Sequence, residues 1–280
     1  MKILILGLSG QMGTALSQTL NKHEIISNKN RFDDIENFIK EVNEISFDLM
    51  INCVALHDLN VCERDNKLAD NINTKIPFLL SELCIKKQKK FIHFSTDYVF
   101  DGMSSKSYEE SDITNPLNYY AISKKNGEDL ILKDNNSIII RVSSLFGKRR
   151  NNSTKNFIEK ILEISKNNKS ITIVSDQIMK PTSTNMVSNL ISNQLENIFE
   201  SNGIYHLCNH GKTSWFEFTK FIFKELSIKT ELIPIEYSEL KLNISRPLFT
   251  SLSTKKIEEK FNFKIDYWEK DLCTYLNEFK

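Results

Sequence analysis

Tyr120 and Lys124 are the two residues of this sequence that are best suited to acid–base chemistry together. They lie four positions apart in a segment with a helical pattern, so their side chains share one helix face. A phenol has a pKa of about 10, and a nearby ammonium group favours its ionised form. The spacing predicts that Tyr120 gives a proton to a carbonyl oxygen. The alternatives are a solvated helix face and the neighbouring Tyr119, which lies off the shared face.

The segment STDYVFDG, residues 95–102, places polar groups directly after an apolar run at 90–95 that is predicted to be a buried strand. Ligands bind at the carboxyl ends of strands in parallel sheets. We therefore expect the Thr96 hydroxyl to polarise a substrate carbonyl near Tyr120, with Asp97 beside it as a substrate contact.

A glycine-rich segment, GLSGQMG at 7–13, joins the first apolar run to a helical pattern. In such a unit Gly7 permits the tight turn, Gly10 lets the backbone approach a pyrophosphate, and Gly13 lets helix and strand pack closely. The amide groups at the helix start then face the phosphates. The segment predicts a dinucleotide site, against the alternative of an ordinary turn, and Lys124 would then bind the nicotinamide ribose.

The end of the second predicted strand bears on which dinucleotide binds. A carboxylate there would bond the adenosine 2′-hydroxyl and repel a 2′-phosphate. The sequence instead has Asn28 and Lys29, with Arg31 nearby. This favours NADPH as the cofactor, with NADH as the alternative if the cations are merely solvated.

Apolar runs alternate with helical patterns along the first half of the chain. Runs that are apolar on both faces are typical of strands covered by helices on each side. The predicted strands are 2–6, 24–27, 48–53, 90–95 and 137–142, and the predicted helices are 12–21, 33–43, 66–87 and 116–133. The sequence therefore predicts an α/β fold, a doubly wound parallel sheet of the Rossmann type.

After about Gly147 shorter elements mix. The predicted helices are 153–167, 184–199, 214–226 and 267–279, and the predicted strands are 171–174, 203–207 and 229–235. We expect residues 1–150 to form the NAD(P)-binding domain. Residues 151–280 should form mainly a smaller mixed α/β substrate-binding lobe, interleaved with the first domain. In the basic loop between them, Arg149 and Arg150 could touch an anionic ligand.

Composition and charge exclude several classes of protein. The 280 residues include 37 Lys and Arg against 36 Asp and Glu, so no electrostatic feature predicts nucleic acid or an anionic membrane as a partner. No apolar stretch approaches a membrane span, and nothing resembles a signal peptide. The five scattered cysteines fit reduced thiols in the cytoplasm. His206 and Cys208 should share a strand face without further ligands, so no metal site is expected.

Together these segments resemble the dTDP-4-dehydrorhamnose reductases, extended short-chain dehydrogenases that reduce the keto group of a nucleotide-linked sugar. The resemblance covers almost the whole chain. It runs through GLSGQMG, INCVALHDLNVCE at 51–63, STDYVFDG, PLNYYAISKKNGE at 116–128, IIIRVSSLFG at 138–147, DQIMKPTST at 176–184, GIYHLCNHGKTSWFEF at 203–218 and SRPLFTSL at 245–252.

The resemblance also implies roles for single residues. Thr96, Tyr120 and Lys124 would be the catalytic trio, and Asn73 the structural asparagine of short-chain dehydrogenases. The implied cofactor contacts are Gly10, Gln11 and Met12 at the pyrophosphate, Asp33 and Asp34 near the adenine, Ala55, Leu56 and His57 on the nicotinamide side, and Phe94 below it.

Departures from the family pattern bear on the substrate. Ser144 stands where the family usually has a Trp that packs on the sugar, Met179 where it has Gly, and His57 where it has Thr. Loss of an aromatic platform removes apolar contact that orients a sugar ring. The leading substrate is dTDP-4-dehydrorhamnose, reduced to dTDP-L-rhamnose for surface polysaccharide synthesis; a related 4-keto sugar is the alternative. Arg246 is predicted to clamp the substrate diphosphate, unless it forms a surface ion pair.

Two other functions occur on the same scaffold. One is a sugar-nucleotide epimerase or dehydratase, but dehydratases normally carry acidic residues directly after the strand-four Thr, whereas Tyr98 follows Asp97 here. The other is a non-catalytic NADP-binding subunit similar to the regulatory subunit of methionine adenosyltransferase. Homodimers are common among the relatives, although no apolar stripe in this sequence marks an interface.

Overall fold

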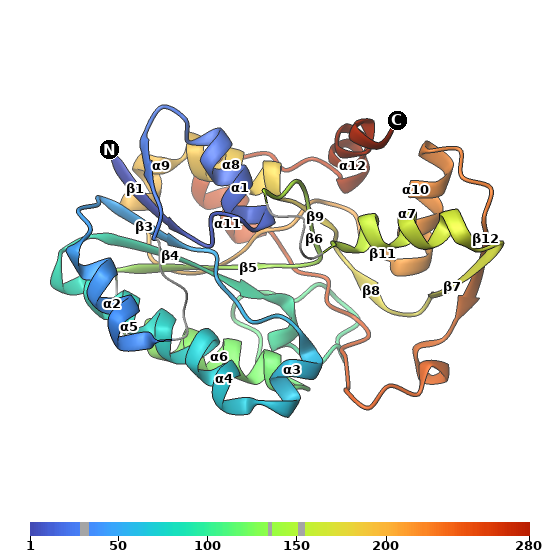
Figure 1. The fold of residues 1–280 in the computed structure, drawn as a ribbon, viewed down its shortest axis with the longest axis horizontal. Coiled ribbons are helices and arrows are strands. Elements are labelled where there is room, and N and C mark those ends of the chain that lie inside the picture. The colour runs from blue at the N-terminus through green and yellow to red at the C-terminus, as the bar shows by residue number, and fades with distance from the viewer. Residues whose placement is uncertain (29–33, 134–135, 151–154) are drawn as a thin grey trace.

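The computed structural model describes residues 1–28, 34–133, 136–150 and 155–280. Within these ranges the centre is a six-stranded sheet in the order β10-β5-β4-β3-β1-β2, with every neighbouring pair parallel (Figure 1). The strands are β1 (Lys2–Leu6), β2 (Glu24–Ile26), β3 (Leu49–Asn52), β4 (Lys90–Thr96), β5 (Ser137–Val142) and β10 (Gly203–His206). The predicted doubly wound α/β fold is confirmed.

Strand β1 shows why these runs are rich in apolar residues. Its side chains alternate between the sheet faces: Ile3 and Ile5 join one hydrophobic cluster, and Leu4 and Leu6 join another. All four are completely buried. Because helices cover both faces, the strand has no solvent-exposed face that a polar residue could occupy.

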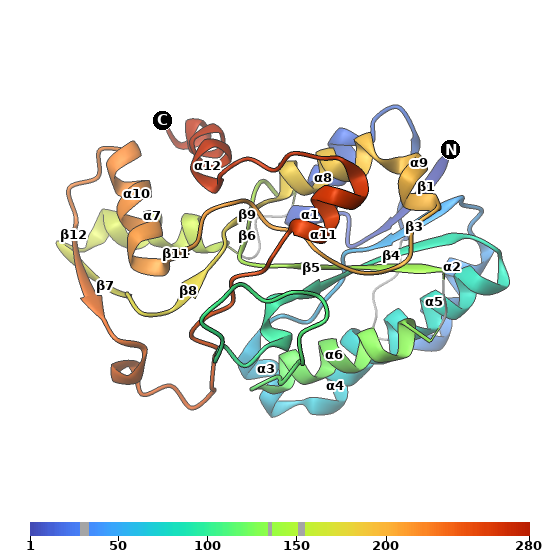
Figure 2. The same cartoon turned by 180° about the vertical axis from the view of Figure 1, so that it is seen from behind.

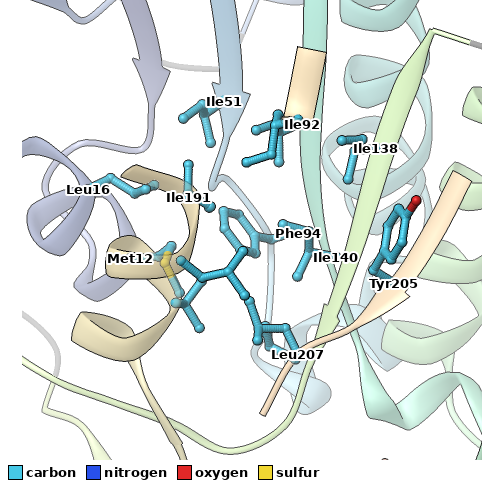
Figure 3. Close-up of a cluster of buried hydrophobic side chains, with 14 of the residues drawn as sticks. Met12, Leu16, Ile51, Ile92, Phe94, Ile138, Ile140, Ile191, Tyr205 and Leu207 are labelled. Carbon is cyan, nitrogen blue, oxygen red and sulfur yellow. The ribbon is translucent and has the colours of Figure 1, made fainter. Parts of the chain in front are cut away.

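One face of the sheet is covered by four helices from both halves of the chain. They are α1 (Gln11–Thr19), α8 (Thr184–Asn193), α9 (Leu195–Phe199) and α11 (Lys255–Phe261), and they lie together on one side of the sheet in both views (Figures 1 and 2). Figure 3 shows Met12 of α1 and Ile191 of α8 beside Phe94 of β4 in the buried cluster.

The other face is covered by α2 (Ile35–Glu44), α5 (Ile76–Lys86) and α6 (Tyr119–Ile131). The long helix predicted at 66–87 is not continuous. It consists of α4 (Asn66–Asp70), a π-helical turn η1 (Asn71–Lys75) and α5. A π-turn adds a residue to the helical repeat and often occurs at functional sites.

A smaller lobe lies beyond the end of the sheet (Figure 1). It pairs β7 (Ser170–Val174) with β12 (Glu231–Ile235) and packs α7 (Phe157–Asn167), α10 (Trp215–Glu225) and α12 (Trp268–Leu276). These elements share a separate hydrophobic cluster with large aromatic members. The two-residue strands β6 (Leu145–Phe146), β8 (Ile178–Met179), β9 (Thr182–Ser183) and β11 (Thr213–Ser214) connect the lobe to the sheet domain.

The second half of the chain also contributes to the main sheet. Strand β10 pairs with β5 in parallel, with Ile204 opposite Ile139. The division of the chain at residue 150 remains a prediction. Other boundaries differ from the predicted ones: helix 184–199 breaks at Gln194, and α3 (Leu59–Arg64) and α11 were not predicted.

A buried ion pair attaches α6 to the sheet. Arg141 of β5 donates through Nη2 and Nε to the Glu128 carboxylate, at 2.7 and 2.9 Å, and both side chains are at most 2% exposed. Arg141 Nη1 lies 3.3 Å from His206 Nε2 on β10. Such a two-bond pair fixes direction as well as distance, so the helix that carries Tyr120 has a defined position over β5.

Candidate active site

The turn between β1 and α1 requires its glycines. Gly7 has a φ of 80°, in the region that L side chains rarely adopt. A Cβ on Gly13 would lie 2.3 Å from the Gly7 carbonyl oxygen, far inside van der Waals contact. Gly10, the N-cap of α1, leaves the first-turn amide groups without a side chain over them, and no acidic residue lies in that turn. The geometry leaves these amides available to an anion.

A cavity of about 490 Å³ begins at this turn. It lies at the carboxyl ends of the strands, where β1 and β3 are neighbours and the chain order reverses, which is where open α/β sheets bind ligands. The predicted site residues that line it are Gly7, Gly10, Gln11, Met12, Gly13, Ala55, His57, Phe94, Thr96, Asp97, Tyr120, Lys124 and Ser144.

Four other predicted residues lie outside this lining. Leu56 is held through its backbone, whose N–H and C=O are both bonded by the Asn73 side chain. Asp34 caps α2 through the Asn37 amide at 3.1 Å. Asn28 lies just past β2, and Arg246 lies in the segment after residue 240. The predicted contacts Lys29 and Asp33, with Arg31, fall outside the described residues.

Tyr120 points into the cavity from the first turn of α6, whereas Tyr119 does not. The Tyr119 hydroxyl donates instead to Asp70 Oδ2 of α4 at 2.8 Å, and Tyr119 does not line the cavity. Burial raises the pKa of Tyr120, and a hydrogen bond with Thr96 partly offsets that rise. The sequence suggested the opposite direction through a nearby ammonium, but the desolvation of the phenol dominates.

Lys124 lies one turn further along α6 and is 1% exposed. Its Nζ donates to the Phe94 carbonyl at 2.7 Å and lies 2.9 Å from His93 Nε2. Burial lowers the pKa of Lys124 to about 8, while the Glu128 carboxylate acts in the other direction. The amine is therefore held at the cavity wall by β4, in reach of any group bound beside it.

Thr96 and Asp97 form the opposite wall at the end of β4. The Thr96 hydroxyl donates to Asp97 Oδ1 at 3.1 Å, and the neighbouring Ser143 and Thr250 hydroxyls also act to lower the pKa of Asp97. Burial nevertheless raises the pKa of Asp97, because these hydroxyl groups offset only part of the desolvation. Neutral polar groups are thus favoured around Tyr120 in this part of the site.

Asn73 connects the loop after β3 to α6. Besides clamping Leu56, its Nδ2 donates to Ser123 Oγ at 3.0 Å, and the asparagine is completely buried in the π-helical turn. The position of Asn73 fits the structural role that the resemblance implies.

Arg246 does not line the cavity, but it lies near Tyr98, a neighbour of Tyr120. Its charge lowers the pKa of the Tyr98 phenol, although burial raises that pKa more strongly. The Tyr98 ring meets the Tyr120 ring edge-on at 6.1 Å between centroids. The Nε atom of Arg246 is buried and has no hydrogen-bond partner among the described residues.

Sequence reasoning missed several lining residues that have little chemistry of their own. They are Ser9, Cys53, Val54, Ser95, Val142 and Leu145. Most stand at or just past the carboxyl end of β3, β4 or β5, so the rule that ligands bind at these ends could have found them. His93 and Asn52 were also missed. Both are completely buried, and they form a row with Lys124 in which His93 Nε2 lies 2.9 Å from Lys124 Nζ and Asn52 Nδ2 lies 3.1 Å from His93 Nδ1.

The lining fits a dinucleotide. It combines an uncapped helix start for the diphosphate with an apolar wall that includes Met12, Phe94 and Val142. In the described part of the chain, no group of three or more His, Cys, Asp or Glu residues could hold a metal ion. His206, considered for such a site, bonds the Tyr108 carbonyl at 3.1 Å instead.

Comparisons with known proteins agree with this geometry. A family model described as the RmlD substrate binding domain matches residues 1–280. The chain is 30% identical over 288 residues to the dTDP-4-dehydrorhamnose reductase of Aggregatibacter actinomycetemcomitans, with 97% of each chain covered. It is 29% identical to the spore coat polysaccharide biosynthesis protein SpsK of Bacillus subtilis, with 99% of this chain and 97% of SpsK covered.

A solved structure shows the same likeness in three dimensions. The dTDP-4-dehydrorhamnose reductase of Bacillus anthracis, in complex with NADP, matches with a TM-score of 0.90 and 27% identity. The match covers 100% of this chain and 99% of that one.

Proposed function

The chain belongs to the RmlD family of dTDP-4-dehydrorhamnose reductases, and from this premise we propose that it uses NADPH to reduce the 4-keto group of a dTDP-linked deoxysugar. One observation carries the proposal: a single cavity joins the glycine turn at the start of α1 to Tyr120 on α6. The leading substrate is dTDP-4-dehydrorhamnose, because the A. actinomycetemcomitans and B. anthracis relatives, which match nearly the whole chain, are named for it.

NADPH is the proposed cofactor, with NADH as the alternative, because the B. anthracis relative was solved with NADP. When bound, its nicotinamide supplies the hydride. The first turn of α1 would hold the diphosphate, with Gly10 allowing the close approach. Ala55 and His57 would border the nicotinamide side, with Phe94 beneath it.

Three side chains of this protein would serve the carbonyl group. Tyr120, kept protonated by burial, would donate its hydroxyl proton to the carbonyl oxygen. Thr96, which bonds Tyr120, would orient that oxygen through a second hydroxyl. Lys124 would hold the nicotinamide ribose from the cavity wall.

Substrate selection would lie with Asp97, Ser144 and Arg246. Asp97 and Ser144 line the cavity, so both could contact the sugar. The small Ser144 leaves open which 4-keto sugar fits. Arg246, next to Tyr98, would bind the substrate diphosphate with its guanidinium fork.

The test is turnover of a substrate panel. The purified protein is mixed with NADPH and several dTDP-linked 4-keto sugars, with UDP-linked sugars as controls. Loss of NADPH absorbance and a product two mass units heavier by mass spectrometry are expected. NADPH binding without oxidation by any dTDP-sugar would refute the reductase and favour a regulatory role.

We further propose a cytoplasmic homodimer that contributes to surface polysaccharide synthesis. The five cysteines are free thiols, which fits a reducing compartment. No helix among the described residues has both the length and the apolar character to cross a bilayer. The similarity to SpsK, a spore coat polysaccharide protein, supports the pathway. Light scattering in solution tests the dimer.

A further inference from the structure

The backbone around Arg246 is held by side chains from other parts of the molecule. The Arg246 N–H donates to the Tyr237 hydroxyl at 3.0 Å. The carbonyl of the next residue, Pro247, accepts from Gln177 Nε2 at 3.0 Å, and Gln177 is 5% exposed. Bonds on both sides of its Cα therefore fix where the Arg246 side chain begins.

The Arg246 guanidinium, in contrast, is free to bind a ligand. Among the described residues it forms no ion pair and no side-chain hydrogen bond, and its Nε atom is buried without a partner. A partly buried cation has lost water and is stabilised when an anion replaces that water. A guanidinium binds phosphate oxygens through two parallel N–H bonds, so a diphosphate is a suitable anion.

One hydroxyl group closes the loop that precedes this arginine. Tyr237 Oη donates to the Ile244 carbonyl at 2.9 Å and accepts from the Arg246 N–H, so it uses both its donor and an acceptor site. The Tyr237 N–H donates to Asp176 Oδ1 at 2.8 Å, just before β8. The start of the loop is thus attached to the lobe, and its end is attached to its start.

The same segment contacts the helix that carries Tyr120. Asn118 is the N-cap of α6, where its Oδ1 accepts from the Ala121 N–H at 3.0 Å. Its Nδ2 donates to the carbonyl of Ser245 at 3.0 Å, and Asn118 is 3% exposed. The backbone next to Arg246 therefore has a fixed position relative to the first turn of α6.

We propose that Tyr237 is a positioning residue that holds Arg246 where its guanidinium binds the diphosphate of a dTDP-linked sugar. The inference rests on the proposed function in taking the ligand to be such a nucleotide. Tyr237 acts through the backbone of Arg246 and does not contact the substrate itself. Because Asn118 connects the same segment to α6, a diphosphate held by Arg246 has a set distance from Tyr120.

The first experiment observes the Arg246 side chain in the wild-type protein. The ¹H–¹⁵N NMR signal of its Nε–H group is assigned with Arg246→Met and followed while dTDP is added. We expect the signal to shift as dTDP saturates the protein, and to stay in place when thymidine, which has no phosphate, is added. An unchanged signal at saturating dTDP would overturn the proposal, and this measurement needs no altered protein to bind.

The second experiment removes the hydroxyl with Tyr237→Phe. Loss of the hydrogen bond to the Arg246 backbone should raise the dissociation constant for dTDP roughly tenfold, measured by titration calorimetry. The affinity for NADPH should stay the same. With a dTDP-sugar that is turned over, KM should rise while kcat is retained. Tyr119→Phe, which removes a hydroxyl bonded to Asp70, is the matched control and should keep the affinity for dTDP.

A double-mutant comparison shows whether Tyr237 acts through Arg246. In the Arg246→Met background, Tyr237→Phe should change the dissociation constant for dTDP by less than about twofold. An equal loss in both backgrounds, or no loss when Arg246 is present, would refute the positioning role.

These binding measurements do not depend on turnover. If they give the expected pattern but no sugar of the panel is reduced, the proposed reaction is wrong and the role of Tyr237 stands. If the panel is reduced but Tyr237→Phe binds dTDP like the wild type, the proposed reaction stands and the role of Tyr237 is wrong.

Discussion

At the scale of single residues, burial has opposite effects on the two pKa values at the centre of the site but favours the neutral form of both groups. It raises the pKa of Tyr120 and lowers that of Lys124 to about 8. A neutral phenol is the form that can donate a proton to a carbonyl oxygen. The neutral phenol is therefore consistent with the proposed role of Tyr120 as the proton donor in a reduction.

The Tyr120→Phe variant should lose about 10²–10⁴-fold in turnover, because it removes the proposed proton donor. Its affinity for NADPH, measured by fluorescence titration, should remain close to that of the wild type. The matched control is Tyr119→Phe, which removes a hydroxyl bonded to Asp70 outside the cavity and should keep its turnover. Near-normal turnover in Tyr120→Phe would show that the proton comes from elsewhere.

The Lys124→Met variant should show how much the buried amine of Lys124 lowers the free energy of unfolding. The pKa of Lys124 is about 8 in the folded protein against 10.5 in the unfolded chain, so between these values the unfolded state binds more protons. This term makes wild-type stability rise with pH from about 8 to 10.5. Relative to the wild type, Lys124→Met should gain roughly 3 kcal/mol more below pH 8 than above pH 10.5.

Urea denaturation of both proteins across this pH range measures the difference. A gap between the two stabilities that does not change with pH would contradict the depressed pKa of Lys124.

At the scale of elements, the site depends on two connections that bring backbone close to backbone. The turn into α1 packs Gly13 against the Gly7 carbonyl. The π-helical turn η1 places Asn73 where it can bond both the loop after β3 and α6. Each connection positions one wall of the cavity without contributing a reactive group.

Gly13→Ala and Gly10→Ala should separate folding from cofactor binding. The Gly13 Cβ would lie 2.3 Å from a backbone oxygen, so overpacking should destabilise the protein by about 1–3 kcal/mol. The Gly10 Cβ would meet the same oxygen at 3.4 Å, and its φ of −74° suits alanine. Gly10→Ala should therefore unfold like the wild type in urea but bind NADPH more weakly, because the methyl group occupies the approach to the amides.

If Gly10→Ala bound NADPH as tightly as the wild type, the diphosphate would not rest on this turn. The comparison needs only urea denaturation and a binding titration on the same two variants.

At the scale of the whole molecule, the two halves of the chain share one hydrophobic core. Helices α8, α9 and α11 and strand β10 follow residue 150, yet their side chains join the cluster that covers one face of β1, β3, β4 and β5. The smaller lobe has a cluster of its own. Residues after 150 thus contribute side chains to both hydrophobic clusters.

A fragment of residues 1–150 should therefore fail to fold cooperatively. It lacks β10 as the edge strand and the helices that cover one sheet face, so apolar side chains such as Ile140 would be exposed. Circular dichroism during heating should show no sharp transition, whereas the full chain should show one. A fragment that unfolds cooperatively and binds NADPH would mean that residues 1–150 are an independent domain.

The sequence by itself determined the parallel sheet, most of its helical cover and the residues proposed to carry the chemistry. Apolar runs mark strands covered on both faces, the glycine spacing marks a close approach of backbone, and the four-residue step places Tyr120 and Lys124 on one face of α6. These signals are local, so they are visible in a linear sequence. The choice of Tyr120 over Tyr119 also followed from spacing alone.

Only the tertiary structure decided what lies around these groups. It gave the direction of the Tyr120 pKa, the separation of Asp34 and Arg246 from the cavity lining, and the row of Asn52, His93 and Lys124. Each depends on residues from strands and helices far apart in the chain. Desolvation and hydrogen-bond direction are set by neighbours in space, and spacing along the chain carries no record of them.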